Sequence, residues 1–218
     1  MVLPKDEFSS VNQAFRKQNG GRSIPVIDDR SSHLVLVSSS LDADEENRNW
    51  IASHLKRIDD LETYDGFRSA KVNFDDKIHL EGMRTWKTVY NRGKKLKLSF
   101  YFRVSAAVGR SYKVFVHVDK SGGANRIGAD HWVLNLPGNE KEKNCVGCFR
   151  TDHWMVGDIV EDTFEVDIPI GTSAGPHKVW MGLYEPGSGK RMKVKGFDKL
   201  SVEHDGGNRV KVGSITVM

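Results

Sequence analysis

The chain has 218 residues, of which 38% are hydrophobic and 28% charged, the composition of an ordinary folded domain. Its net charge of +4 is small, and its densest basic stretch, residues 92 to 97, alternates with apolar residues as a solvated strand does. Nucleic acid is therefore not an expected partner. No apolar run approaches the ~18 residues of a membrane span, and the first ten residues resemble no signal peptide. We expect a chain that is soluble as given, and a fragment cut from a membrane protein would show the same pattern.

Residues 1 to 66 have the character of an N-terminal segment with one strand and one helix. Residues 1 to 23 are polar and glycine-containing, so we expect a poorly ordered start. Residues 34 to 37 form a short apolar run that predicts a buried strand. Over residues 45 to 58, after a possible N-cap at Asp44, helical spacing predicts one amphipathic helix with the apolar residues Trp50, Ile51, Leu55 and Ile58. The turn at Asp65 and Gly66 marks the boundary.

Residues 67 to 218 show the two-residue period of strands. In the clearest strand, Leu96, Phe100 and Val104 belong to a predicted core face, while the intervening Lys95, Lys97, Ser99, Tyr101 and Arg103 are predicted to face water. Similar alternation recurs over residues 112 to 118, 164 to 168, 179 to 183 and 210 to 217, and residues 127 to 136 are a further strand candidate. A change of phase near Gly213 predicts a β-bulge. About eight or nine short strands predict a mainly all-β fold. The expected architecture is an antiparallel two-sheet β-sandwich, immunoglobulin- or jelly-roll-like, with a short N-terminal α-helical appendage.

The two cysteines, Cys145 and Cys148, lie in the sequence Cys-Val-Gly-Cys within a polar loop. This spacing is half of a zinc site, which His131 or His153 could complete. A zinc module normally has a second close pair and none follows, so we expect no metal. Thioredoxin-like redox chemistry would need the pair at the start of a helix. A local disulfide and two free thiols remain open, and no cofactor-binding loop occurs, so no cofactor is expected.

Several carboxylates and histidines could in principle support acid–base catalysis. Their spacing shows no convergence, and most stand where strands become turns, which favours structural roles for His117, Asp119, Asp130, His131, Asp152, His153, Asp158 and Asp162. We therefore assign no catalytic residue and expect no enzyme. The alternative is a glycoside-processing hydrolase that uses paired carboxylates such as Asp130 and Asp162.

Large aromatic residues are numerous: Trp86, Tyr90, Trp132, Trp154, Trp180 and Tyr184. Carbohydrate-binding sandwiches stack sugars on exposed rings, although core packing accounts for most tryptophans in such folds. Trp180 is a candidate because it lies on the strand face opposite Val179 and Met181. Trp132 is a second candidate, beside His131 in a position close to a loop.

The residues from about 70 to 218 contain short pieces of a family pattern in its expected order. The pieces are Phe115 to Asp119, Ala129 to His131, Trp154 with Gly157, Asp158 and Asp162, then Pro169, Gly175, Gly182 to Pro186 and Gly189 to Arg191. They resemble the extracytoplasmic C-terminal β-sandwich domain of multi-pass membrane glycosyltransferases of the protein-mannosyltransferase type, and related uncharacterised sandwiches. The Cys-Val-Gly-Cys loop and residues 1 to 66 depart from that pattern.

The resemblance implies an accessory module, since catalysis in such enzymes belongs to the membrane part. We expect an extracytoplasmic location, periplasmic or at the cell surface, and a glycan, a glycolipid or a membrane enzyme as partner. The candidate ligand-binding residues are Trp132, Trp154, Trp180, Tyr184, His117, Asp130, His131 and Arg191. The alternative is a purely structural or protein-interaction module without a small ligand.

Overall fold

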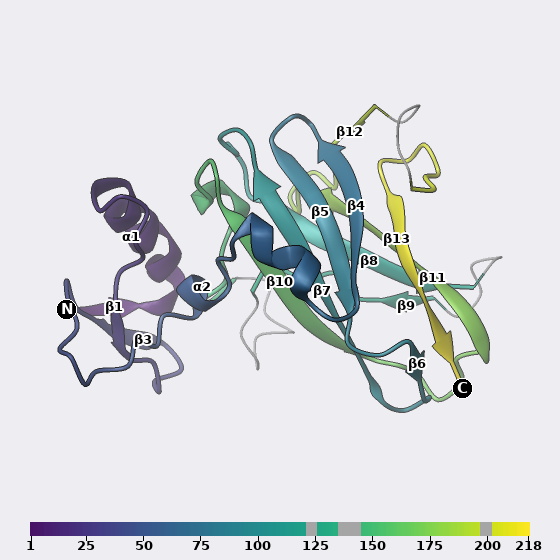
Figure 1. Cartoon of the computed structure of the whole chain (residues 1–218), viewed down its shortest axis with the longest axis horizontal. Coiled ribbons are helices and arrows are strands. Elements are labelled where there is room, and N and C mark those ends of the chain that lie inside the picture. Colours follow the sequence, from purple (N-terminus) through teal and green to yellow (C-terminus); the bar gives the residue numbers. More distant parts are fainter. Residues whose placement is uncertain (121–125, 135–144, 197–201) are drawn as a thin grey trace.

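The computed structural model describes residues 1–120, 126–134, 145–196 and 202–218 (Figure 1). It consists of two five-stranded sheets packed face to face, with an N-terminal unit beside one end of them. This confirms the predicted mainly β fold and its β-sandwich architecture. No helix among the described residues is long and apolar enough to cross a bilayer.

The first sheet has the strand order β10-β7-β5-β4-β12 and is antiparallel throughout. Its strands are β4 (Phe67–Phe74), β5 (Ile78–Thr85), β7 (Lys95–Val104), β10 (Ile159–Asp167) and β12 (Val194–Lys195). The second sheet has the order β6-β13-β11-β8-β9, in which only the short β6 pairs in parallel. Its strands are β6 (Val89–Tyr90), β8 (Lys113–Asp119), β9 (Ile127–Gly128), β11 (Gly175–Tyr184) and β13 (Val210–Val217).

The alternation along β7 places its apolar residues in the core, as predicted. The side chains from Leu96 to Val104 on this face are at most 1% exposed. The prediction for the other face is wrong at Ser99 and Tyr101, which are fully buried. The 3₁₀ helix η1 (Ile58–Thr63) covers that part of the sheet, and its Leu61 packs in one cluster with Tyr101. Ser99 instead hydrogen-bonds to Trp86 (3.2 Å) and Thr163 (2.7 Å), so separate tertiary contacts remove from water two positions that the two-residue period assigns to it.

The predicted bulge is confirmed on β13. The pairing register shifts between Val179 and Trp180, which lie opposite Gly213 and Lys211, so Val212 is the extra residue. The candidate strand over residues 127 to 136 is much shorter than predicted. It comprises β9 and an isolated bridge between Val114 and His131, and residues 135 and 136 lie outside the described residues.

The N-terminal unit is folded from its first residues, contrary to the expected poorly ordered start. Helix α1 (Lys5–Gln18) packs on a three-stranded sheet of β1 (Val2–Pro4), β3 (Leu34–Val37) and β2 (Val26–Asp28). The strand expected over residues 34 to 37 is β3. Along α1, Phe8 and the polar Asn12 are fully buried and Arg16 is 4% exposed. The buried face of α1 is largely polar, so its apolar pattern is too sparse to indicate a helix.

The helix predicted over residues 45 to 58 is wrong in extent. Only α2 (Trp50–Ser53) is helical, and the side chain of Asn49 caps it by accepting a hydrogen bond from the Ala52 N–H (3.0 Å). Asn47 accepts hydrogen bonds from the backbone of Val26 and of Asn49, which ties the preceding residues to the N-terminal sheet. The side chains of Asn47 and Asn49 accept hydrogen bonds from backbone N–H groups, and these bonds outweigh the helical spacing of the apolar residues.

The N-terminal unit is joined to the sandwich by a buried ion pair. The guanidinium of Arg16 donates two hydrogen bonds to the carboxylate of Asp158 (2.9 and 2.5 Å), and both side chains are under 10% exposed. The apolar core is continuous from Phe8 to the sandwich residues. The domain boundary at residue 66 stays a prediction.

We expect Phe100→Ala to lower the free energy of unfolding by about 3–5 kcal/mol, because the ring is fully buried between the sheets. Urea unfolding followed by circular dichroism measures the change. Ile170, which is 81% exposed, provides the control, and Ile170→Ala should leave stability nearly unchanged. A loss below 1 kcal/mol for Phe100→Ala would contradict the assignment of this face.

We expect Arg16→Met to cost about 3–5 kcal/mol of unfolding free energy, because it leaves the carboxylate of Asp158 buried without its partner. The double variant Arg16→Met with Asp158→Leu should recover much of that loss. Arg30→Met removes an ion pair on an exposed guanidinium and serves as the control, with an expected change under about 1 kcal/mol. Equal losses of unfolding free energy for Arg16→Met and Arg30→Met would show that the ion pair between Arg16 and Asp158 does not hold the N-terminal unit on the sandwich.

Candidate functional site

Four of the predicted ligand-binding residues gather on the outer face of the second sheet or at its edge. His117, Trp180 and Tyr184 stand on β8 and β11, and Arg191 bridges to the end of β11. Around them, Arg191 lies over the ring of Phe115 (4.6 Å) and Arg209 over the ring of Trp180 (4.7 Å). These residues, Phe115, His117, Trp180, Tyr184, Arg191 and Arg209, form what we call the cation–aromatic ladder.

The ladder is closed rather than open to a ligand. Trp180 is 6% exposed and Phe115 is 3% exposed, because the arginines cover their rings. Arg209 is itself held by the carboxylate of Asp205, and Arg191 donates to the backbone oxygen of Gly207 (2.6 Å). Burial, assisted by the charge of Arg126, lowers the pKa of His117 below its ordinary value. Trp180 therefore offers no flat face for stacking.

Of the remaining predicted rings, one belongs to the core and one to the surface beside β8. Trp154 is 3% exposed, packs against Phe102 and Phe149, and donates from Nε1 to the Phe149 oxygen (3.0 Å). It is a core residue and not the ligand platform that the sequence suggested. Trp132 is half-buried, with the ammonium group of Lys113 at 5.1 Å from its ring centroid.

The structure buries His131 in an ion pair instead of exposing it to a ligand. Its Nε2 lies 2.9 Å from Asp162 Oδ2 and its Nδ1 lies 2.7 Å from the Ala129 carbonyl oxygen. Both partners can accept hydrogen bonds, so this geometry suits a ring that carries a proton on each nitrogen. Burial by itself lowers the pKa of His131, but the charge and hydrogen bond of Asp162 and the Ala129 carbonyl outweigh it and raise that pKa above its ordinary value.

The two carboxylates of the hydrolase alternative lie in different surroundings. Asp162 is fully buried and committed to His131, while Asp130 is exposed and accepts from the Val116 N–H (3.3 Å). A glycosidase needs both groups to flank the scissile bond in one cleft. Asp162 is fully buried and paired with His131, so it is not open to a substrate.

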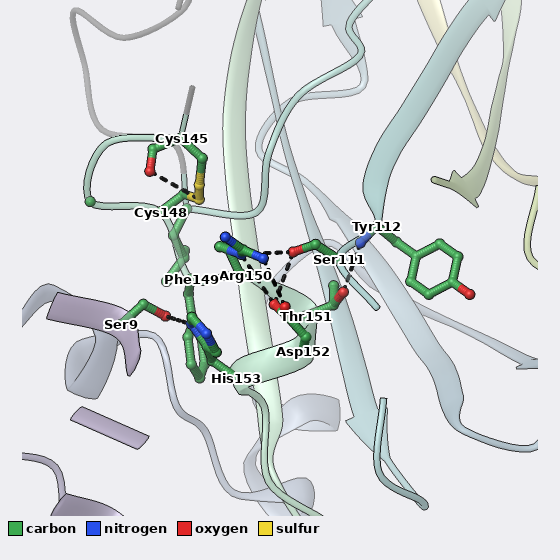
Figure 2. The surroundings of a disulfide bond; sticks show 12 residues. Ser9, Ser111, Tyr112, Cys145, Cys148, Phe149, Arg150, Thr151, Asp152 and His153 are labelled. Atoms are coloured by element: carbon green, nitrogen blue, oxygen red, sulfur yellow. Dashed lines mark hydrogen bonds and ion pairs between the residues drawn. A yellow bond between two sulfur atoms is a disulfide. The ribbon is translucent and has the colours of Figure 1, made fainter. Parts of the chain in front are cut away.

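Figure 2 shows the two cysteines joined as a disulfide, with a group of hydrogen-bonded polar side chains at residues 150 to 153 beside them. His153, the possible third zinc ligand, instead bonds to Ser9 on α1 through Nδ1 (2.8 Å). Arg150 donates to Ser111 (3.0 Å) and to both carboxylate oxygens of Asp152. Within the described residues no group of three or more His, Cys, Asp or Glu side chains could hold a metal ion.

A pocket of about 300 Å³ lies on the outer face of the first sheet. Its lining comes from the covering segment, residues 54 to 64, and from the strands beneath it: His54, Lys56, Tyr64, Arg84, Trp86, Lys97, Glu161 and Thr163. The segment is held there by backbone pairing, since the Lys56 N–H donates to Ile159 (2.8 Å) and the Glu161 N–H donates to His54 (2.8 Å). We call this site the Trp86 pocket.

Trp86 is the exposed ring of this pocket. It is 43% exposed, and its Nε1 donates to the hydroxyl of Ser99 (3.2 Å), which shares a hydrogen bond with Thr163 (2.7 Å). Two cations lie against the ring, with Arg84 Cζ at 4.0 Å and Lys97 Nζ at 3.9 Å from its centroid. An exposed ring beside several hydrogen-bonding groups is the arrangement of a small-ligand site.

Glu161 supplies the pocket's carboxylate. It pairs with Lys56 (3.1 Å) and accepts from the hydroxyl of Tyr101 (2.8 Å). Burial and the neighbouring Glu161 charge raise the pKa of Tyr101 well above its usual range, so the hydroxyl stays protonated and donates. The sequence shows Trp86 as one ring among several, but it gives no sign that residues 54 to 64 build a wall around it.

No family model matches the chain, and no curated protein matches it. Several solved structures are similar to this chain over part of its length. The Pseudomonas fluorescens alkylpurine DNA glycosylase AlkC, bound to DNA containing an abasic site analog, shares 18% identity with a TM-score of 0.35, and covers 68% of this chain and 30% of its own.

A Niemann-Pick type C2 protein from the Japanese carpenter ant shares 9% identity with a TM-score of 0.36, over 71% of this chain and 96% of its own. A CARDB domain from Pyrococcus furiosus, in complex with di-metal ions, shares 12% identity with a TM-score of 0.31, over 71% and 98%. The chain thus spans less than a third of the length of the glycosylase. Scores this low assign neither a ligand nor an activity to this chain.

We expect the contribution of His131 to stability to be lost as the pH rises. Its folded-state pKa lies above the ordinary value of 6.5, so the stabilisation is complete below about pH 6.5 and disappears as the pH passes the folded-state pKa. Urea unfolding over a pH series should show this dependence in the parent protein and not in a double variant with His131→Asn and Asp162→Asn.

Burial lowers the pKa of His79, His117 and His153, so these histidines make the stability of the protein rise with pH. The quantity to compare is therefore the difference in unfolding free energy between the parent and the double variant at each pH. The exposed His33 provides a control, and His33→Asn should keep the parent profile. An NMR titration of the His131 ring with a midpoint below 6.5 would show that the buried ion pair is assigned wrongly.

Proposed function

We propose that this protein is a non-catalytic binding module that takes a carbohydrate in the Trp86 pocket. The observation that carries the proposal is the pocket itself, a recess of about 300 Å³ with a ring that is 43% exposed at its mouth. Sugars bind proteins by stacking apolar C–H faces on such rings while their hydroxyls bond to polar groups around them. Glu161 and Thr163 supply acceptors, and Arg84 and Lys97 supply donors.

The accessory role and the cell-envelope location rest on the resemblance found in the sequence and remain proposals. The disulfide between Cys145 and Cys148 supports an oxidising compartment, since disulfides persist mainly outside the cytoplasm. A membrane enzyme or a glycolipid surface would then present the carbohydrate to the module.

A structural or protein-interaction module is the second candidate. The closed ladder supports it, because the rings on the outer face of the second sheet are covered by arginines and stiffen the sheet without offering a cavity. In that case the Trp86 pocket would have no carbohydrate ligand.

A glycan-array screen of the whole chain, followed by calorimetry on the best oligosaccharide, tests the proposal. An affinity near ~1 mM is ordinary for such sites, and Trp86→Ala should weaken it at least about tenfold, a loss of ~1.4 kcal/mol. Trp132→Ala removes a ring beside the other sheet and should leave the affinity unchanged. Thermal unfolding of both variants checks that they remain folded.

Binding that depends on Trp132 and not on Trp86 would move the site to the second sheet. Absence of binding to every oligosaccharide would favour the structural module.

A further inference from the structure

We propose that the carbohydrate bound in the Trp86 pocket is anionic, and that Arg84 and Lys97 together bind its carboxylate or sulfate group. This inference rests on the proposed function and names the ligand class for the same site. It follows from the balance of charges in the pocket, from the positions of the two cations around one ring, and from the contrast with the neighbouring cations on the same sheet.

The pocket has more positive than negative charge. Its lining includes Arg84, Lys97 and Lys56 against one carboxylate, Glu161. Glu161 is engaged with Lys56 at 3.1 Å and with the hydroxyl of Tyr101 at 2.8 Å. Among the residues that the structure describes, no carboxylate lies within ion-pair distance of Arg84 or Lys97. Two positive charges in the pocket are thus left without a counter-charge.

The other cations on the outer face of β7 show that this is a local feature. Lys95 pairs with Glu165 (3.6 Å), and Arg103 pairs with Glu81 (2.6 Å). Glu165 stands directly opposite Lys97 in the register of β10 and β7, yet its carboxylate goes to Lys95. Lys97 instead lies over the ring of Trp86. Along β7, the cations on either side of the pocket are paired with carboxylates, and Lys97 inside it has no such pair among the described residues.

The geometry around Trp86 suits an anion held by two cations. Arg84 Cζ and Lys97 Nζ lie 4.0 and 3.9 Å from the same ring centroid, which places both charges beside the exposed ring of the pocket. Arg84 is fixed by a hydrogen bond from its Nε to the Asp65 carbonyl oxygen (2.8 Å) and its side chain also lies within hydrogen-bonding reach of the Tyr101 hydroxyl, while its terminal nitrogens have no carboxylate partner among the described residues. A guanidinium presents these nitrogens as a pair that fits a carboxylate or a sulfate. A ring alone offsets the repulsion between two cations only partly, whereas an anion offsets it directly.

Neutral groups for the sugar hydroxyls lie beside this anion site. Thr163 lines the pocket, and its hydroxyl shares a hydrogen bond with Ser99 (2.7 Å). His54 donates from Nδ1 to the Trp50 carbonyl oxygen (2.7 Å), because a carbonyl can only accept, and this leaves Nε2 for another partner. Trp86 then contacts the pyranose while Arg84 and Lys97 take its acidic substituent.

Matched pairs of oligosaccharides with one backbone and different charge provide the test. Calorimetry at low salt compares galacturonic-acid hexamers, methyl-esterified or free, and dextran oligomers, unmodified or sulfated. The charged member of at least one pair should bind about tenfold more tightly or better, and the two pairs distinguish carboxylate from sulfate. Arg84→Gln and Lys97→Gln should each remove most of this preference. Lys178→Gln, the same charge change on the opposite sheet, should preserve it.

Each other outcome overturns the inference in a recognisable way. Equal, Trp86-dependent binding of neutral and charged members would reject the anionic ligand while the proposed function stands. A charge preference that survives both Arg84→Gln and Lys97→Gln would reject the assigned residues. Hexathymidylate that binds through the same residues as tightly as the charged hexamers would reject a carbohydrate in favour of a general polyanion. If no oligosaccharide binds, the proposed function and this inference fail together.

Discussion

The backbone pairing between residues 54 to 56 and the edge of β10 is the constraint on which the candidate site depends. An open sheet edge presents unpaired N–H and C=O groups, and here the chain covers part of that edge with its own preceding segment. The two hydrogen bonds at Ile159 and Glu161 fix the path of the chain, and η1 then crosses the outer face of the first sheet. In Figure 1 this crossing is the blue helical turn over the sheet. Without it, Tyr101 would be exposed and the Trp86 pocket would lose one wall.

The two outer faces of the sandwich use the same residue types to opposite effect. On the second sheet, Arg191 and Arg209 are anchored by Gly207 and Asp205 and seal the aromatic rings beneath them. On the first sheet, Arg84 and Lys97 contact a ring that stays 43% exposed, and the covering segment adds walls without closing the space. The difference lies in how far the rings are covered, since Trp180 and Phe115 are 6% and 3% exposed while Trp86 is 43% exposed.

Buried charge pairs join the parts of this molecule. Arg16 and Asp158 connect the N-terminal helix to the loop before β10, and His131 and Asp162 connect the edge of the second sheet to β10. Removing charges from water is costly, so such pairs need further hydrogen bonds, and here Arg16 also donates to the Gly21 oxygen and Asp162 also accepts from the Leu134 N–H. Each pair fixes one relative position of two segments that apolar contacts alone would allow to slide.

The sequence alone determined the β-sandwich, because the two-residue period along β7, β8 and β11 follows directly from which side chains are apolar. It also indicated a bulge near Gly213 by a change of phase, and the structure places this bulge at Val212. Only the tertiary structure decided which outward residues are covered and which ring is open. Helix α1 escaped prediction because its buried face is polar and gains its partners from distant residues. The Trp86 pocket escaped it because its walls come from residues 54 to 64 and from β5, β7 and β10, whose alignment depends on cross-strand register and backbone pairing that no local pattern encodes.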